Sequence, residues 1–295
     1  MAKSLEIIKC TFFVISSIVS STIFFGLILE ETFREYEIDN DYNTNIKERI
    51  SQAKSSFPVI SRVKLPNHDQ EDPELVKDLN SKILPPCSSS KEYKLYQNER
   101  GGIGKFEHIR KLTSTKAERF FLECGARDGV SLSNTLYLEK NLFWKGLLVE
   151  ADPAHFENII SVHRKAWIAP VCMSLNTSAY VAHFNSSLSF EGKILTNETK
   201  DDMVQVVCYP FYTFILAMNI KKIDYFSLSV AGHEMEILET IPFDRVDIGF
   251  VSVNVSYSRG GSRGVTNFMT RHGYELVKEF PPSELLFVHI DEDYW

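Results

Sequence analysis

Short apolar runs alternate with segments of helical periodicity through the middle and end of the chain. Residues 120–124 form a mostly apolar run that leads into a Gly-x-x-x-Gly turn starting at Gly125. Residues 131–141 then predict a helix whose buried face carries Leu132, Leu136 and Leu138. A second apolar run, residues 146–149, ends in an acid. This order of strand, turn, helix and strand is typical of a nucleotide-binding α/β unit.

The same alternation continues to the end of the chain. Further apolar runs predict strands at 166–173, 204–208, 223–230, 248–255, 274–280 and 285–290, with a hairpin at 180–184 and 188–190. Helical segments separate them at 153–165, 210–218, 234–240 and 265–272. The pattern predicts an α/β fold, a mostly parallel sheet with helices on both faces. Because the last two strands are too close for a crossover helix, one of them should be antiparallel.

The N-terminal segment predicts a membrane anchor. No charged residue occurs between Lys9 and Glu30, and the interval is long enough to cross a bilayer as a helix. Positive residues precede it and acidic residues follow it, which favours a cytosolic tail at 1–9 and a transmembrane signal anchor at 10–29. A cleaved signal peptide is the alternative.

The segment after the anchor is polar and contains several prolines. We expect residues 30–100 to form a lumenal stalk with one short helix, which starts at Asp72-Pro73 and stops at Pro85. The folded domain is then expected to span residues 101–295.

Composition and modification motifs agree with a lumenal domain. The net charge is −7, so no basic surface predicts a nucleic-acid partner. Three closely spaced Asn-x-Ser/Thr motifs predict glycosylation at Asn176, Asn185 and Asn197. Four cysteines beyond the anchor allow three full pairings, and we favour a disulfide between Cys172 and Cys208, since both end apolar runs. No metal site is expected, because the histidines are scattered and no Cys-x-x-Cys occurs.

The first α/β unit carries the chemistry of a cofactor site. Gly125 and Gly129 lack a Cβ, so the backbone there can approach a ligand closely. Asp128 and Ser131 can cap the following helix. Glu150, at the end of the second strand, is placed to accept hydrogen bonds from two ribose hydroxyls, an arrangement that disfavours a cofactor with a 2′-phosphate.

The motifs at 123–129 (Glu-Cys-Gly-Ala-x-Asp-Gly), 133–136, 146–150 and 166–172 resemble FkbM-type methyltransferase domains. More narrowly, they are similar to the membrane-anchored Star family, and the resemblance runs from Asp72 to Val288. It implies a Rossmann-like S-adenosylmethionine methyltransferase fold behind the transmembrane helix. It places the cofactor around Glu123, Gly125, Ala126, Asp128, Gly129, Asn134, Glu150 and Asp152. It also implies a role in the endoplasmic reticulum, Golgi or endosome, with secreted or membrane proteins as clients, for example growth-factor precursors.

A second motif departs from the family pattern. Where FkbM-type domains have Asp-Val-Glu-Gly-Ala-Glu, this chain has Ser229, Ala231 and His233 in place of the Asp, the Glu and the Ala. Methyl transfer to a hydroxyl needs a base or a metal near the attacking oxygen, and Ser229 and Ala231 supply neither. His233 is a candidate base, although a histidine at a helix start is commonly structural.

The sequence is therefore compatible with two functions. The first is a membrane-anchored methyltransferase-like protein with weak or no catalysis that acts in the trafficking of clients. The second is an active O-methyltransferase on a lumenal glycan, lipid or small molecule.

Overall fold

The computed structural model describes residues 51, 69–95, 119–185, 193–195 and 204–292. The chain divides into two compact units, Met1–Glu48 and Arg49–Trp295, and the described residues all lie in the second. The predicted anchor at 10–29 lies outside the described residues. Within those residues, the longest apolar helix falls short of what a bilayer crossing requires.

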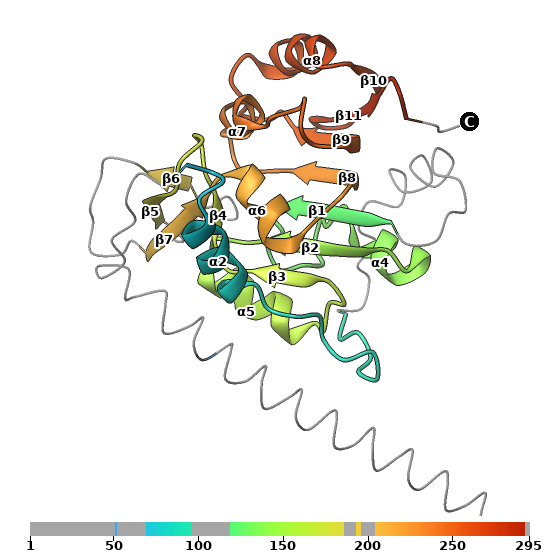
Figure 1. Ribbon diagram of the computed structural model, residues 1–295. Helices are drawn as coiled ribbons and strands as arrows, with labels where there is room; N and C mark the ends of the chain where they lie inside the picture. The colour runs from blue at the N-terminus through green and yellow to red at the C-terminus, as the bar shows by residue number, and fades with distance from the viewer. Residues whose placement is uncertain (1–50, 52–68, 96–118, 186–192, 196–203, 293–295) are drawn as a thin grey trace, which may run out of the picture. The chain divides into compact units, whose positions relative to one another are not determined.

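A seven-stranded sheet forms the centre of the domain, in the order β10-β11-β9-β8-β1-β2-β3 (Figure 1). Its strands are β1 (Phe120–Cys124), β2 (Lys145–Val149), β3 (Trp167–Ala169), β8 (Ile223–Leu228), β9 (Ile248–Asn254), β10 (Tyr274–Phe280) and β11 (Glu284–His289). The pairs among β3, β2, β1, β8 and β9 are parallel. Strand β11 runs antiparallel to both β9 and β10. The predicted mostly parallel sheet with an antiparallel final strand is therefore confirmed.

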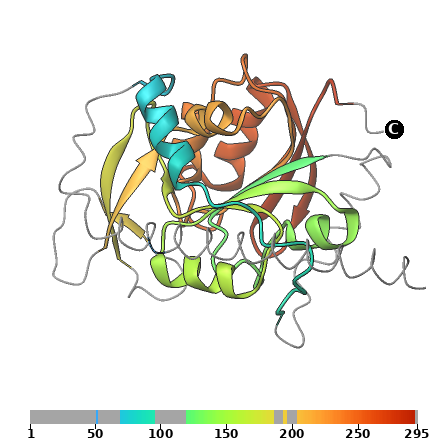
Figure 2. The ribbon, with the colours of Figure 1, turned by 60° about the horizontal axis from the view of Figure 1, so that its bottom comes forward.

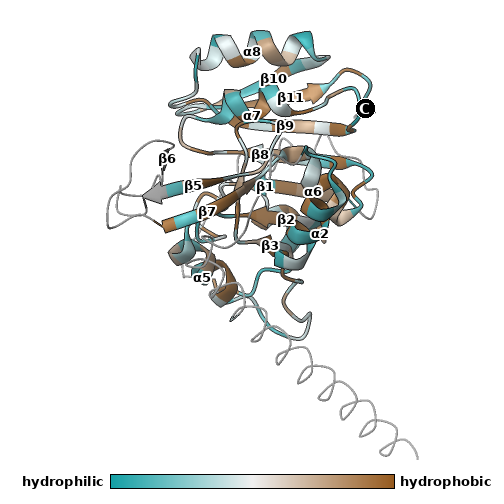
Figure 3. Cartoon of the chain, turned by 60° about the vertical axis from the view of Figure 1, so that its left-hand side comes forward, coloured by the Kyte–Doolittle hydropathy of each residue, from teal (hydrophilic) through white to brown (hydrophobic). Residues whose placement is uncertain are grey.

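Helices cover both faces of this sheet, because successive strand residues point to opposite sides. On β1, Leu122 packs into one buried cluster with α2 (Pro73–Lys82), α6 (Phe211–Met218), α7 (Glu234–Thr240) and α8 (Gly261–Arg271). Its neighbour Phe121 packs into a second cluster with α4 (Leu136–Leu142) and α5 (Pro153–Ser161). Figure 2 shows the sheet between these two layers. The central strands β1 and β2 are mostly apolar on both faces for this reason, as their brown colour in Figure 3 shows, whereas the edge strand β10 is partly exposed and polar.

A small second sheet joins the first at one end. It has the order β4-β7-β5-β6, from β4 (Cys172–Met173), β5 (Tyr180–Asn185), β6 (Lys193–Leu195) and β7 (Val204–Tyr209). The single strand predicted at 166–173 is thus two strands in different sheets, because Pro170 has no N–H to continue the ladder. The predicted strand at 188–190 lies outside the described residues, and β5 pairs instead with β6 and β7.

The favoured cysteine pair closes this second sheet. Cys172 of β4 and Cys208 of β7 are directly paired in register, and a disulfide joins them with their Cα atoms 4.3 Å apart. The bond encloses 36 residues of chain. A loop of that length corresponds to about 4 kcal/mol of stabilisation by loop-closure entropy.

Residues 69–95 differ from the predicted stalk. The short helix is present as α2, with Asp72 accepting a 2.8 Å hydrogen bond from the amide of Glu74. Its Leu75 and Leu79 are fully buried in the core, and Leu84 forms a bridge with Ile168 at the edge of β3. The folded domain therefore begins well before residue 101. In the sequence, the only sign of this packing is the apolar face of α2, which lies within an otherwise polar segment.

Candidate functional site

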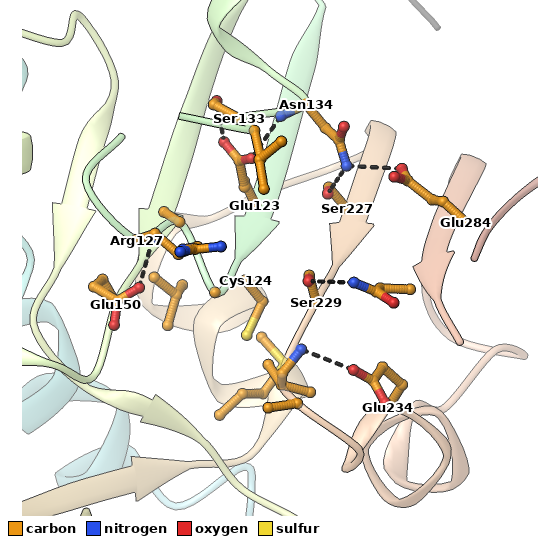
Figure 4. A pocket seen from close by; sticks show the side chains of 18 of the residues that line it. Glu123, Cys124, Arg127, Ser133, Asn134, Glu150, Ser227, Ser229, Glu234 and Glu284 are labelled. Atoms are coloured by element: carbon orange, nitrogen blue, oxygen red, sulfur yellow. Dashed lines mark hydrogen bonds between the residues drawn. The ribbon is translucent and has the colours of Figure 1, made fainter. Parts of the chain in front are cut away.

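A cavity of about 430 Å³ opens at the carboxyl ends of the parallel strands (Figure 4). Residues that follow β1, β2 and β8 line it, together with residues from the ends of β9 and the start of β11. Ligands of open α/β sheets bind at this edge. The volume also lies within the usual range for small-molecule sites, about 300–1,000 Å³.

The glycine turn after β1 is shaped by the protein itself. Gly125 has φ +80°, and a Cβ there would lie 1.9 Å from the carbonyl oxygen of Ser229. Gly129 has φ +76°, and its Cβ would face Ile159 of α5 at 3.1 Å. We expected both glycines to admit a ligand. Gly125 does line the cavity, but its missing side chain admits the loop after β8, and Gly129 lies outside the lining.

Glu150 is held rigidly at the cavity wall. Its Oε2 accepts a 2.6 Å hydrogen bond from the amide of Arg127, and its Oε1 accepts a 2.8 Å bond from the amide of Asp152. The side chain is 6% exposed. Burial raises the pKa of Glu150 to about 7, although the two amide hydrogen bonds act in the opposite direction. The carboxylate is thus oriented toward the cavity and titrates near neutrality.

Glu123, the other acid of the first motif, organises the segment that follows the turn. It is buried and accepts hydrogen bonds from the hydroxyls of Ser133 (2.8 Å) and Thr135 (2.5 Å) and from the amide of Asn134 (2.8 Å). The Asn134 side chain then donates to Ser227 Oγ at 2.9 Å (Figure 4). Glu123 therefore holds residues 133–135 in place, and Ser133 and Asn134 of this segment line the cavity.

Arg164 supports the same segment, and sequence analysis did not find it. Its side chain is fully buried and pairs with Glu139 through Nε, at 2.9 Å from Oε2. It also donates to the carbonyl of Gly129 and to the hydroxyls of Ser133 (3.2 Å) and Thr135 (3.0 Å). An arginine in a polar loop carries no sequence signal of such burial.

The helix predicted at 131–141 begins later than expected. Asp128 Oδ1 accepts hydrogen bonds from the amides of Val130 (3.0 Å) and Ser131 (2.7 Å), which forms a turn, and α4 starts only at Leu136. Leu132 adopts φ +62° and is 73% exposed at the cavity, whereas we expected it on the buried face. A left-handed residue cannot continue a right-handed helix, so the helix is delayed.

Asp128 and Asp152 do not line the cavity. Asp152 caps α5, where its Oδ1 accepts a 2.8 Å bond from the amide of Ala154. Of the residues expected to surround the cofactor, those that line the cavity are Glu123, Gly125, Ala126, Asn134 and Glu150. The remaining three, Asp128, Gly129 and Asp152, shape the two loops behind them.

The loop after β8 forms the opposite wall. Ser229 and Ala231 line the cavity, and Ala231 has a positive φ of 53°. Glu234 is 1% exposed and accepts hydrogen bonds from the amides of Val230 (2.9 Å) and Gly232 (3.1 Å), which fixes the loop. Burial raises the pKa of Glu234.

His233, the candidate base, lies at the N-cap of α7 and outside the cavity lining. Its Nε2 is buried without a hydrogen-bond partner. The structure therefore does not bring His233 together with the other site residues.

Glu284 is the acid that sequence analysis missed. It begins β11 and reaches the cavity, where Oε1 accepts hydrogen bonds from Asn134 Nδ2 (2.8 Å) and Ser252 Oγ (Figure 4). The chain separates Glu284 from Asn134 by 150 residues. Only the antiparallel placement of β11 beside β9 brings them together, so a local motif could not reveal this contact.

The glycosylation motifs lie in different settings. Asn176 is exposed. The side chain of Asn185 and all of Asn197 lie outside the described residues. Asn254, in a fourth motif, lines the cavity, and its Nδ2 donates to Ser229 Oγ at 3.2 Å. Across the described parts of the chain, no three His, Cys, Asp or Glu side chains are grouped to hold a metal ion.

Comparisons with known proteins place the domain in a family. A model of the methyltransferase FkbM domain matches residues 123–276, just over half of the 295-residue chain. No curated protein matches the chain.

Solved structures with a similar arrangement are remote in sequence. A methyltransferase from Pyrococcus furiosus is 14% identical, with a TM-score of 0.36 over 66% of this chain and 88% of that one. The human methyltransferase 10 domain containing protein is 11% identical, with a TM-score of 0.38 over 64% and 81%. TYW2 from M. jannaschii, in complex with AdoMet, is 12% identical, with a TM-score of 0.29 over 67% and 78%. On the family match, which includes the Gly125 turn, Glu150 and the loop after β8, this chain belongs to the methyltransferase FkbM domain family.

Proposed function

We propose that the cavity binds S-adenosylmethionine. The observation that carries this proposal is the Glu150 carboxylate, which two backbone amides hold at the cavity wall. Each of its oxygens retains a lone pair that can accept from a ribose hydroxyl. Val149, Val171 and Met173 line the cavity beside it and offer an apolar surface to a purine base. The residues present therefore fit this cofactor.

Catalysis on the opposite side of the cavity lacks the acids of the family pattern. Bound S-adenosylmethionine supplies a methyl group activated by a sulfonium. Ser229 and Ala231 line the cavity where the family pattern has Asp and Glu, and neither side chain can accept a proton at neutral pH. Loss of general-base help costs about 10²- to 10⁴-fold in rate. We therefore propose weak methyl transfer, or none.

We further propose that the chain is a type II membrane protein that acts in secretory-pathway trafficking, with the methyltransferase-like domain in the lumen. The uncharged stretch 10–29 and the three glycosylation motifs support this topology. The resemblance to the Star family supports clients such as growth-factor precursors, carried between the endoplasmic reticulum, Golgi and endosome. In this role the domain recognises its clients by binding.

An active O-methyltransferase is the second candidate, and Glu284 favours it. This carboxylate lines the same side of the cavity as Ser229 and is oriented by Asn134 and Ser252. A carboxylate in this position can receive the proton of an attacking hydroxyl. The acceptor would be a lumenal glycan, lipid or small molecule.

Calorimetric titration of the detergent-solubilised full chain with S-adenosylmethionine tests the cofactor proposal. We expect Glu150→Ala to weaken binding about 10- to 100-fold, since two hydrogen bonds to a charged group are lost. Glu275→Ala, which removes an exposed carboxylate of β10, is the matched control and should bind as the wild type does. Equal affinity of all three proteins would refute the proposed site.

Methyl release and client secretion then separate the two functions. Wild type and Glu150→Ala are compared for transfer of labelled methyl groups to lumenal extracts and for secretion of a growth-factor precursor. We expect little transfer, and secretion that survives Glu150→Ala. The double variant Ser229→Asp with Ala231→Glu should raise transfer. Robust transfer by the wild type, lost together with secretion in Glu150→Ala, would establish the enzyme instead.

A further inference from the structure

The cavity extends beyond the Glu150 side, to which the proposed cofactor site belongs. Six residues form this further part, from the loops after β8 and β9 and from the turn between β10 and β11: Ser229, Asn254, Ser256, Tyr257, Ser283 and Glu284. We call this set the hydroxyl-rich half. Figure 4 shows Ser229 and Glu284 facing the cavity across from Glu150.

Hydrogen bonds within the hydroxyl-rich half hold its polar side chains in place, and some of their donors can still bind a ligand. The Asn254 side chain is held on its oxygen side by the amide of Ser256 (3.0 Å) and the hydroxyl of Ser283 (3.3 Å), and its Nδ2 donates to Ser229 Oγ at 3.2 Å. The second N–H of that amide and the hydroxyl hydrogen of Ser229 remain to bind a ligand. Donors and acceptors thus alternate along the wall.

Charge limits what this half can accept. Among the described residues that line the whole cavity, Arg127 is the one Arg or Lys side chain, and it lies beside Glu150 (Figure 4). The hydroxyl-rich half itself contains the carboxylate of Glu284 and no cationic side chain. A phosphate or carboxylate ligand would be repelled there, whereas a hydroxyl can donate to Glu284.

An aromatic ring completes the wall. Tyr257 lines the cavity and is 65% exposed, and its backbone carbonyl and Cβ lie next to Gly232. An exposed tyrosine offers a flat apolar face with a polar tip. A pyranose ring matches this surface, because its C–H face is apolar and its edge carries hydroxyls.

We propose that the hydroxyl-rich half binds a neutral, hydroxyl-bearing ring of the hexose type, with Tyr257 against its face and Glu284 accepting from its hydroxyls. The ring would lie beside the sulfonium end of the bound cofactor. The hexose site is an acceptor subsite for methyl transfer only if the Glu150 half binds S-adenosylmethionine, so the inference rests on the proposed function.

Saturation-transfer NMR and calorimetry on the detergent-solubilised full chain test the inference, with methyl glucoside, methyl galactoside and methyl mannoside as neutral probes. Glucose 6-phosphate and glucosamine serve as the anionic and cationic counterparts. We expect at least one neutral glycoside to bind about tenfold more tightly than glucose 6-phosphate, because Glu284 repels the phosphate. The ammonium group of glucosamine is attracted by Glu284, so this sugar should not be disfavoured in the same way. Comparison with the same hexose at the end of an oligosaccharide identifies whether the source is a free sugar or a glycan.

Two variants and their controls locate the binding. Tyr257→Ala should weaken glycoside binding about fivefold or more, whereas Phe143→Ala, which removes an 84% exposed ring elsewhere, should not. Glu284→Gln should weaken it about tenfold. Because Glu284 also supports Asn134, the exposed Tyr257 provides the variant that leaves packing intact.

The two proposals fail separately. S-adenosylmethionine affinity is measured on the same samples, and Tyr257→Ala should leave it unchanged. Glycoside binding that is absent, no tighter than the binding of glucose 6-phosphate, or insensitive to Tyr257→Ala would overturn the inference even if the cofactor binds. Loss of cofactor binding in the wild type would instead overturn the proposed function.

Discussion

The two halves of the cavity are built in different ways. The half around Glu150 comes mainly from one continuous stretch, β1 to the start of α5, with Val171 and Met173 added from the chain after β3. Backbone amides of that stretch hold the carboxylate. The hydroxyl-rich half comes from three separate segments, and its side chains hold one another through Asn254, while Asn134 from the other half donates to Glu284. The first half is therefore specified locally, and the second depends on the order of the strands.

This difference in construction separates the proposed cofactor half from the half proposed to bind an acceptor. A local strand-turn-helix unit can hold a carboxylate at its own turns whatever the opposite wall carries, because the amides of Arg127 and Asp152 that hold Glu150 belong to the unit itself. One contact that crosses between the halves is the close approach of Gly125 to the carbonyl of Ser229. Ser229 and Ala231 belong to the opposite wall, so their identity does not alter the amides that hold Glu150.

The largest expected effect tests the scaffold of the Glu150 half. Arg164→Leu leaves Glu139 buried without its cation, and such a change costs about 3–5 kcal/mol of unfolding free energy. Urea unfolding of the variant measures it. The double variant Arg164→Leu with Glu139→Leu removes both charges and should recover part of the loss. A single variant as stable as the wild type would contradict the buried pair.

Gly125→Ala tests the contact between the halves. The new Cβ would meet the Ser229 carbonyl, and alanine is disfavoured at φ +80°. We expect a loss of about 2–5 kcal/mol, from about 1–2 for the left-handed backbone and about 1–3 for overpacking. Gly261→Ala is the matched control, because it also has a positive φ but nothing within 4 Å of its Cβ. A control that loses as much stability would show that the contact with Ser229 is unimportant.

The sequence predicts features that depend on neighbouring residues better than features that depend on distant ones. The alternation of apolar runs predicts the parallel sheet, and Glu150 is placed correctly at the end of β2, because both signals are short-range. Glu284 and Arg164 escaped prediction, since each acquires its role through partners far away in the chain. The polar sequence of residues 69–95 predicts a stalk, because one amphipathic helix does not reveal which surface covers it.

The pH dependence of cofactor binding probes Glu150 directly. Its pKa of about 7 means that the carboxylate is mostly protonated at pH 6 and mostly ionised at pH 8. If ribose hydroxyls donate to the anion, S-adenosylmethionine affinity should rise about tenfold between these pH values, as the competent fraction does. Calorimetry at several pH values measures this rise, and Glu150→Gln should abolish it.

The stability of the unliganded protein should change in the opposite direction. Since the folded-state pKa lies above the usual value of 4.5, the folded state holds a proton that the unfolded state has lost between pH 4.5 and pH 7. Stability from this group is therefore present below about pH 4.5 and is lost as the pH rises through 7. Glu150→Gln should flatten that part of the profile. A wild-type profile that rises between pH 5 and pH 7 and is unchanged by Glu150→Gln would contradict the burial of this acid.

The smallest expected effect lies in the loop of the hydroxyl-rich half. Ala231 has φ +53°, which costs an alanine about 1–2 kcal/mol, whereas a glycine there pays about 0.5–1 kcal/mol in chain entropy. Ala231→Gly should therefore stabilise the protein by about 0.5 kcal/mol, the reverse of Gly125→Ala in the facing loop. Thermal unfolding measures it, with Ala154→Gly, in the first turn of α5, as a control that should destabilise. If Ala231→Gly lowers the melting temperature, the Ala231 methyl group contributes packing that outweighs its backbone strain, and the loop is more firmly specified than its lost acids suggest.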